Sequence, residues 1–300
     1  MRLATFNCNG IRAAMRRGLD AWLHTADPDV LALQEVRCPV EALPSFASDL
    51  HLRYDPGRLA GRNGVAVLTR DSPTAVRTWG ADVYCRAPGS DHVDLVAAEP
   101  GDSLARGLRA FADEGRYLEV DLAECPVTVG CLYLPKGGLP AELQRPGRMR
   151  DAPDGGAKYQ RKMRFLDAFA RQLETTRRAA LRAGREFVLV GDLNIAHTRW
   201  DVARWRASQR SEGFLPEERA WYTSILGTRK LIDVARAQAG DTPGPYTWWS
   251  WLGTSYERDL GWRIDVQLAT PALARSARSV RVDRGERMSD HAPVMVEYAT

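Results

Sequence analysis

The chain places polar side chains directly after two apolar runs, a position from which a strand can present catalytic groups to a cleft. Asp192 and Asn194 follow residues 187–191, an apolar run closed by a glycine. There Asp192 can orient an attacking water, and Asn194 can hold phosphate oxygens. Glu35 ends a similar run, residues 30–34, and a carboxylate there suits Mg²⁺, which prefers oxygen ligands. Each residue also fits an ordinary strand end or turn.

Two asparagines end the first apolar run of the chain. Asn7 and Asn9 alternate after residues 2–6, so their side chains share one face of the predicted strand. They can hydrogen-bond metal-bound waters and a catalytic carboxylate. The alternative is a simple turn, because Asn9 is followed by Gly10 and Asn-Gly is a common turn signal.

One histidine has acidic residues in positions that suit proton chemistry. His291 follows Asp290 and precedes a strand-like run, while Asp265 ends the segment 262–265. A carboxylate can hold a histidine protonated or in one tautomer, which lets it polarise a phosphate or transfer a proton. A lone histidine is more often structural. We give that interpretation to three others: His24, His51 and His92.

Composition narrows the alternatives. The sequence contains no Gly-x-Ser-x-Gly elbow, Walker-type phosphate loop or His-Glu-x-x-His pair. Its five cysteines lack metal-site spacing and a protease-like signature, which favours reduced thiols and a cytosolic protein. The formal charge of +4 comes almost wholly from arginine, whose planar fork suits phosphate oxygens. A nucleic-acid partner is compatible with this charge.

Short apolar runs alternate with amphipathic segments. We predict strands over residues 2–6, 29–34, 64–69, 117–122, 127–134, 186–190, 263–268 and 293–298. We predict helices over residues 18–25 and about 159–182. Many short strands with few long helices favour an α/β fold in which two sheets pack face to face between helices. A doubly wound parallel sheet is the alternative.

No internal repeat or linker divides the sequence, so we predict one domain over residues 1–300 with an extended loop region at about 71–116. No apolar run is long enough to span a bilayer, and no secretory signal is visible. We therefore expect a cytoplasmic protein that does not bind membranes.

Six motifs in order closely resemble the exonuclease III and abasic-site (AP) endonuclease family. They are Phe6-Asn7-Cys8-Asn9-Gly10-Ile11-Arg12, Leu33-Gln34-Glu35-Val36-Arg37, Tyr133-Leu134-Pro135, Gly191-Asp192-Leu193-Asn194-Ile195-Ala196-His197, Trp262-Arg263-Ile264-Asp265 and Ser289-Asp290-His291-Ala292-Pro293. Segments 213–219 and 246–251 resemble blocks of the DNA-repair members. The resemblance implies the endonuclease/exonuclease/phosphatase fold, a four-layered α/β sandwich of two mixed β-sheets packed face to face and flanked by helices.

The resemblance also implies catalytic roles. Asp192 would align the attacking water, and Asn194 and Tyr133 would contact the phosphate. His291 would polarise that phosphate, with Asp265 as its orienting partner. The identity of the true base stays open.

A metal group is implied beside these residues. Glu35 would bind Mg²⁺, for which Mn²⁺ can substitute, with Asn7 and Asp290 close to the ion and Asn9 in its water shell. Exchanged roles for Asp265 and Asp290 stay open, as does the choice between one ion and two.

Two further groups would contact DNA. An apolar pocket for a flipped-out abasic deoxyribose is implied at Trp248, Trp262 and Ile264. A sugar without its base is small enough to enter where a normal nucleotide clashes. Contacts to backbone phosphates are implied at Arg12, Lys158, Arg161 and Lys162. The alternatives are core tryptophans and a solvated helix face.

The resemblance implies a monomeric, Mg²⁺-dependent DNA repair nuclease, associated with the nucleoid in a prokaryote. It would be an AP endonuclease, a 3′-5′ exodeoxyribonuclease that also cleans 3′ ends, or both, acting on double-stranded DNA. One alternative is a phosphatase or phosphodiesterase of the same fold that acts on a non-DNA phosphoester. Another is a non-catalytic DNA-binding module. The segment 206–212 lacks the lysine and asparagine cluster of relatives, which leaves the balance between the nuclease activities open.

Overall fold

Two mixed β-sheets form the centre of the molecule. The structure is a computed structural model that describes residues 1–59, 61–99, 101, 103–147 and 152–300. Sheet A has eight strands in the order β13-β14-β1-β2-β4-β3-β6-β7. Their bounds are β1 Arg2–Asn7, β2 Val30–Gln34, β3 His51–Asp55, β4 Val65–Thr69, β6 Asp82–Arg86, β7 Asp94–Ala97, β13 Ala277–Val282 and β14 Val294–Tyr298.

Sheet B has six strands in the order β11-β12-β10-β9-β8-β5. Their bounds are β5 Ala75–Thr78, β8 Tyr117–Asp121, β9 Val127–Tyr133, β10 Glu186–Asp192, β11 Ile232–Asp233 and β12 Asp265–Ala269. β10 runs parallel to β9 and antiparallel to β12, so the end of β10 lies beside the end of β9 and the start of β12.

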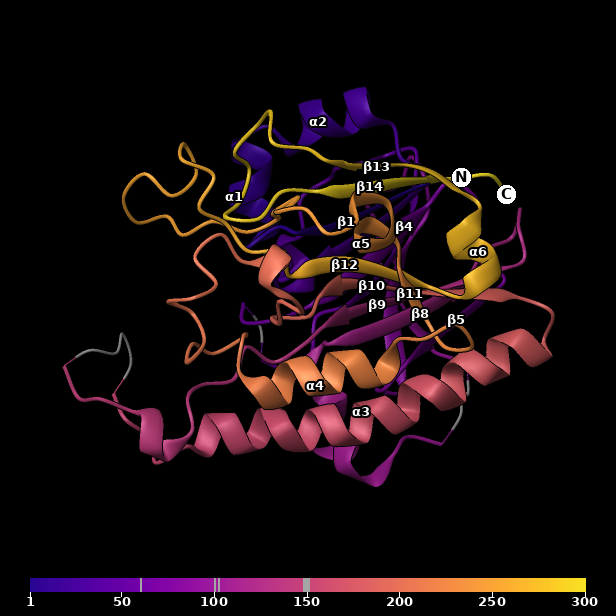
Figure 1. The fold of residues 1–300 in the computed structure, drawn as a ribbon. Helices are drawn as coiled ribbons and strands as arrows, with labels where there is room; N and C mark the ends of the chain where they lie inside the picture. The colour runs from indigo at the N-terminus through magenta and orange to yellow at the C-terminus, as the bar shows by residue number, and fades with distance from the viewer. Residues whose placement is uncertain (60, 100, 102, 148–151) are drawn as a thin grey trace.

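Strand alternation explains how the layers stack. In β1, Leu3 packs into the core between the sheets, whereas Phe6 packs with Trp22 in the core beneath the helices that cover sheet A. These helices are α1, Ile11–Arg16, and α2, Leu19–Ala26. Figure 1 shows them on one side of the sheets and two other helices on the opposite side: α3, Ala157–Arg182, and α4, Pro216–Ile225. The predicted four-layered sandwich is confirmed, and the doubly wound single sheet is wrong.

The helix α3 covers the outer face of sheet B with its apolar side. Phe165, Phe169 and Leu173 recur at helical spacing along it and are buried in one core with the outer face of sheet B. Trp221 of α4 joins the same core and donates its indole N–H to the Leu166 carbonyl at 2.7 Å. The two helices therefore pack together on the outer face of sheet B.

The region at about 71–116 differs from the predicted extended loop. It contains β5, which borders sheet B, and β6 and β7, which extend sheet A. It also contains η2, Arg106–Glu114, which packs on α3. The edge strand β7 gave no alternating apolar signal, because neither of its faces is buried: all four of its residues are exposed.

The remaining elements are short. They are η1 Val40–Ala42, η3 Ala141–Leu143, η4 Arg199–Asp201, α5 Val234–Ala239 and α6 Pro271–Arg275. Within the part of the chain that the structure describes, no helix has the length and apolar character needed to cross a bilayer.

Candidate active site

Three predicted catalytic residues lie level with one another on adjacent strands of sheet B. Asp192 ends β10, where it is paired with Tyr133 at the end of β9 and with Asp265 at the start of β12. All three side chains are buried. The strand register therefore brings together residues that are up to 132 positions apart in the sequence, since 265 − 133 = 132.

The Asp192 carboxylate is held by amide groups from both sheets. Its Oδ2 accepts a hydrogen bond from Asn7 Nδ2 at 2.8 Å and one from Asn194 Nδ2 at 3.2 Å. Its Oδ1 accepts from the Asn194 backbone N–H at 2.8 Å. Because Asn7 ends β1 of sheet A, this contact ties the two sheets together at the site.

His291 faces Asp192 across a short gap. Its Nδ1 is 2.8 Å from Asp265 Oδ2, and its Nε2 is 4.0 Å from Asp192 Oδ2. Burial alone would lower the pKa of His291, but the carboxylates of Asp265, Asp192 and Asp290 outweigh it and raise the pKa to about 10. The histidine is therefore a buried imidazolium at neutral pH.

In Asp192, burial disfavours the charged form of the carboxyl group. Burial raises the pKa of its carboxyl to about 7, with Asp265 and Glu35 adding to the rise and His291 opposing it. A carboxyl with a pKa near neutrality can take up a proton during a reaction and release it afterwards. The structure thus sets a proton acceptor and a fixed cation side by side.

A second cluster lies around Glu35. The Tyr133 hydroxyl donates to the Glu35 carboxylate, and the Arg37 guanidinium forms an ion pair with the same group. Arg37 Nη1 also donates to Asn9 Oδ1 at 2.7 Å, and Asn9 Nδ2 donates to Asp290 Oδ1 at 2.7 Å. These bonds connect Glu35 to Asp290 across the cavity.

Sequence reasoning missed Arg37. The residue was visible in the motif that ends with it, two positions after Glu35, but a basic side chain beside an expected metal ligand was given no role. The local backbone explains its direction: Glu35 and Arg37 both have φ of 50°. Asn9 and Asn194 are also left-handed, with φ of 45° and 48°, so backbone conformations that are rare for side-chain-bearing residues gather at this site.

The site opens into a cavity of about 700 Å³. Trp248, Trp262 and Ile264 line it, as do Asp192, His291 and Glu35. The rings of Trp248 and Trp262 meet edge to face, with centroids 6.4 Å apart, and Trp248 Nε1 donates to Asp290 Oδ2 at 3.1 Å. The predicted apolar group therefore borders the predicted catalytic group.

The rim of this cavity carries a tryptophan that the predictions did not include. Trp251 lines the cavity and is 43% exposed, and the next residue, Leu252, is 82% exposed. The guanidinium groups of Arg17 and Arg287 lie 5.0 Å and 4.2 Å from its ring centroid. The signal was the length of the aromatic run 246–251, of which only Trp248 was assigned.

Two sets of residues can be considered as metal ligands. Asp192, Asp265 and His291 offer ligand atoms that lie within 4.8 Å of one another. In this structure, however, His291 Nδ1 and Asp265 Oδ2 are hydrogen-bonded to each other at 2.8 Å. Glu35 and Asp290 fit a hard cation better, because both present carboxylates to the cavity. Burial opposes the charge on Asp290, but His291 and the N–H groups of Asn9 and Trp248 lower its pKa.

The predicted contacts to a DNA backbone have different positions. Arg12 and Lys158 are exposed. Arg161 is paired with Glu114. The Lys162 side chain is fully buried, where its ammonium donates to Glu218 Oε1 at 2.6 Å, so the predicted phosphate contact of Lys162 is wrong.

The fold and the site together define an α/β sandwich hydrolase that acts on phosphoesters. The chain belongs to the endonuclease/exonuclease/phosphatase family, whose sequence profile matches residues 4–291. The predicted resemblance is therefore confirmed at the level of the family.

Similarity to individual proteins extends over nearly the whole chain. It is 24% identical to an exodeoxyribonuclease of Bacillus subtilis strain 168, over 98% of both chains. It is 26% identical to the DNA repair nuclease APEX1 of Danio rerio, over 100% of this chain and 82% of that protein. Among solved structures it resembles the 3′ phosphatase NExo from Neisseria bound to product DNA hairpin, with a TM-score of 0.75, 26% identity and complete coverage of both chains.

Proposed function

We propose that this protein is a Mg²⁺-dependent DNA repair nuclease that hydrolyses the phosphodiester bond 5′ to an abasic site and removes nucleotides or blocking groups from 3′ ends. The observation that carries the proposal is the pairing of Asp192 with the His291 imidazolium, 4.0 Å apart, in a cavity walled by Trp248 and Trp262. The relatives supply the substrate class, since they are named as an exodeoxyribonuclease, a DNA repair nuclease and a 3′ phosphatase with bound DNA.

The residues of the site divide the reaction between them. Asp192 orients a water and accepts its proton as the oxygen attacks phosphorus, which its pKa of about 7 allows. His291 offers an N–H and a positive charge to a nonbridging phosphate oxygen, where negative charge grows in the transition state. Asp265 keeps the imidazole in place through Nδ1. Asn194 stands beside Asp192 and orients it.

The metal group supports the same reaction. Glu35 and Asp290 would hold Mg²⁺, with Asn7 and Asn9 contacting its waters, and the bound ion would neutralise charge on the phosphate and the leaving oxygen. Tyr133 stays protonated, because burial and the nearby Glu35 raise its pKa well above the ordinary value. It therefore acts as a donor, to Glu35 in this structure and to phosphate when substrate displaces that contact.

The substrate preference follows from the tryptophan wall. Trp248, Trp262 and Ile264 enclose an apolar space beside the reacting groups, and a deoxyribose without a base can enter it at a low cost in lost stacking. Trp251 on the rim offers an exposed aromatic face on which a neighbouring base can stack.

The test compares three substrates with one protein sample in Mg²⁺. A duplex with a single abasic site should be cut 5′ to that site, leaving a 3′-hydroxyl, while the matched intact duplex should lose nucleotides only from its 3′ ends. The His291→Asn variant should be slower by about 100-fold or more. The matched control, His24→Asn, changes an exposed histidine on α2 and should behave as the wild type.

A soluble phosphodiester is the third substrate. If the folded wild-type protein cleaves it while the abasic duplex stays intact, the enzyme is a phosphatase or phosphodiesterase of the same fold that acts elsewhere. If all three substrates stay intact, the non-catalytic alternative replaces the nuclease.

A further inference from the structure

The outer face of sheet B carries polar side chains beneath the C-terminal half of α3, where a face covered by a helix is ordinarily apolar. Tyr117, Glu119 and Asp121 alternate along β8, so they project from the same face. Arg77 of β5 is paired with Glu119, and Thr128 of β9 is paired with Asp121. Because apolar residues fill the rest of the contact with α3, this polar group is a separate feature.

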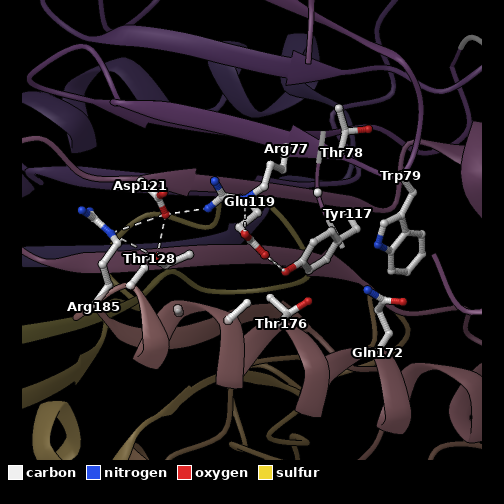
Figure 2. Close-up of a pocket in the computed structure, with 14 residues that line it drawn as sticks. Arg77, Thr78, Trp79, Tyr117, Glu119, Asp121, Thr128, Gln172, Thr176 and Arg185 are labelled. Carbon is white, nitrogen blue, oxygen red and sulfur yellow. Dashed lines mark hydrogen bonds and ion pairs between the residues drawn. The ribbon is translucent and has the colours of Figure 1, made fainter. Parts of the chain in front are cut away.

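The helix leaves a space above this group. Figure 2 shows the cavity, of about 360 Å³, between the strands and α3. At one end the Trp79 ring stacks on Tyr117, with centroids 5.1 Å apart. The helix side of the cavity carries short side chains: Thr176, Ala179, Ala180 and, just after the end of α3, Ala183. A cavity of this volume is large enough for a small organic ligand.

The charged groups in this cavity neutralise one another. Glu119 accepts from Arg77 Nε at 2.5 Å and from the Tyr117 hydroxyl at 2.6 Å. Asp121 accepts from Arg77 Nη2 at 2.6 Å, and Arg185 Nε lies 3.5 Å from the same oxygen. Two carboxylates are therefore matched by two guanidinium groups, and these groups neutralise the carboxylate charges within the cavity wall.

Hydrogen-bond donors remain unused. Gln172, only 7% exposed, accepts from the Ala105 backbone N–H at 2.8 Å through Oε1, which leaves its Nε2 toward the cavity. Among the described residues, neither this amide nitrogen nor the hydroxyl of Thr176, 8% exposed, has a partner. The same is true of Nη1 of Arg77 and of Arg185. The Gln172 and Thr176 side chains are largely buried, but their donor atoms reach the cavity. A ligand that supplies acceptors can therefore take hydrogen bonds that water would otherwise supply there.

We propose that this cavity, the α3 pocket, binds a small organic anion whose carboxylate or phosphate oxygens accept hydrogen bonds from Gln172, Thr176 and the free guanidinium N–H groups. The apolar part of the anion packs against Ala180 and the Trp79 ring. The proposed catalytic reaction uses none of these residues, and the α3 pocket shares no lining residue with the catalytic cavity.

The strand β9 separates the two cavities. Thr128 borders the α3 pocket near the start of β9, while Tyr133 borders the catalytic cavity at its end. Five residues of extended strand place them roughly 17 Å apart. The anion therefore occupies a second site, not an extension of the first.

The test is a calorimetric titration of the full chain without Mg²⁺, using citrate, inorganic phosphate and deoxyadenosine monophosphate as separate probes. At least one should bind with 1:1 saturation. Citrate binding alone identifies a carboxylate site, and binding of either phosphate probe identifies a phosphate site. Thr176→Val removes one donor without changing the side-chain shape and should weaken binding at least about tenfold, as should Gln172→Leu.

Two controls make the test specific. Thr175→Val changes the neighbouring exposed residue on α3, and Thr176→Ser keeps the hydroxyl; both should bind as the wild type. DNA cleavage by Thr176→Val should equal that of the wild type. The proposal is overturned if no probe saturates, or if Thr176→Val binds as tightly as the wild type, which would place the anion in the catalytic cavity. The titration needs no turnover, so it is independent of the proposed nuclease activity.

Discussion

At the scale of single residues, the site depends on two buried groups whose pKa values are both raised. In the proposed reaction Asp192 acts as a carboxylate, and its pKa is raised to about 7. In the same proposal His291 acts as an imidazolium, and its pKa is raised to about 10. Both required forms therefore coexist between these two values, and the reaction should be fastest on the alkaline side of neutrality.

The pH dependence gives the first prediction. Below pH 7, Asp192 takes up a proton, so kcat/KM at low Mg²⁺ should fall about tenfold for each pH unit. Bound Mg²⁺ favours the carboxylate, so this acidic limb should move to lower pH as the Mg²⁺ concentration rises. The measurement is a pH profile of kcat/KM at two Mg²⁺ concentrations. A profile that stays flat between pH 5.5 and 7.5 at low Mg²⁺ would contradict the role given to Asp192.

Arg37 gives the second prediction. Its guanidinium competes with a metal ion for the Glu35 carboxylate, because the two groups form an ion pair. In Arg37→Gln the half-saturating Mg²⁺ concentration should fall by about three- to tenfold, in keeping with the loss of one partly exposed ion pair. Arg37→Lys keeps the charge and is the control. Equal half-saturating concentrations in all three proteins would show that Glu35 does not bind the ion.

The residue predictions also show where sequence reasoning ends. Asp192 and Glu35 were predictable because each follows a short, mainly apolar run. The burial of Lys162 was not, because its partner Glu218 lies 56 residues further along, on another helix. The first turns of α3 hold several basic residues and resemble a solvated face. Only the packing of α4 on α3 decides which of them is enclosed.

At the scale of elements, strand β10 determines the position of the site. It ends with Gly191 and Asp192, and Gly191 has φ of 136°. A Cβ atom at this glycine would lie 2.0 Å from the Leu132 carbonyl oxygen of β9. Backbone atoms of two central strands cannot both keep their places around such a contact. The glycine lets the strands approach closely enough to bring Asp192 level with Tyr133.

The third prediction follows from this contact. Gly191→Ala should lower the free energy of unfolding by about 3 kcal/mol or more, and any folded fraction should cleave DNA poorly because Asp192 is displaced. Gly184→Ala is the control: its φ is also positive, at 72°, but nothing lies within 4 Å of the added Cβ. It should cost about 1 kcal/mol. Urea denaturation of both variants measures the difference in the free energy of unfolding. Similar midpoints would show that β9 can shift to accept the added Cβ at little cost.

Strand prediction succeeded or failed according to burial. β9 and β10 lie inside sheet B and read as continuous apolar runs, so their ranges were predicted within two residues. β5 and β7 are edge strands, made of partly or fully exposed residues, and they were taken for a loop. The paired sheet order could not be derived from local pattern, because it depends on contacts between distant segments.

At the scale of the whole molecule, charge should govern how DNA is held. The chain has a formal charge of +4. The helix α1 begins two residues after Asn9, and this places Arg12 at the end of the sandwich that carries the site. An exposed arginine there can release a counterion when it meets a phosphate. Arg275 ends α6, which follows β12 at the opposite end of that strand from Asp265.

The fourth prediction compares these two arginines. In Arg12→Gln the slope of log affinity for duplex DNA against log salt should become shallower by about 0.9, whereas Arg275→Gln should keep the wild-type slope. Fluorescence anisotropy with a catalytically inactive background and several salt concentrations measures both slopes. Equal slopes in the two variants would show that the bound DNA does not contact α1 through Arg12.

The hydrogen bond between Asn9 and Asp290 joins residues 281 positions apart. During translation, Asp290 and His291 are added 281 and 282 residues after Asn9. Until then neither the imidazolium nor the second carboxylate exists in the nascent chain. A chain that stops before Asp290 therefore lacks both groups and cannot assemble the proposed site, which is completed in a single step of synthesis.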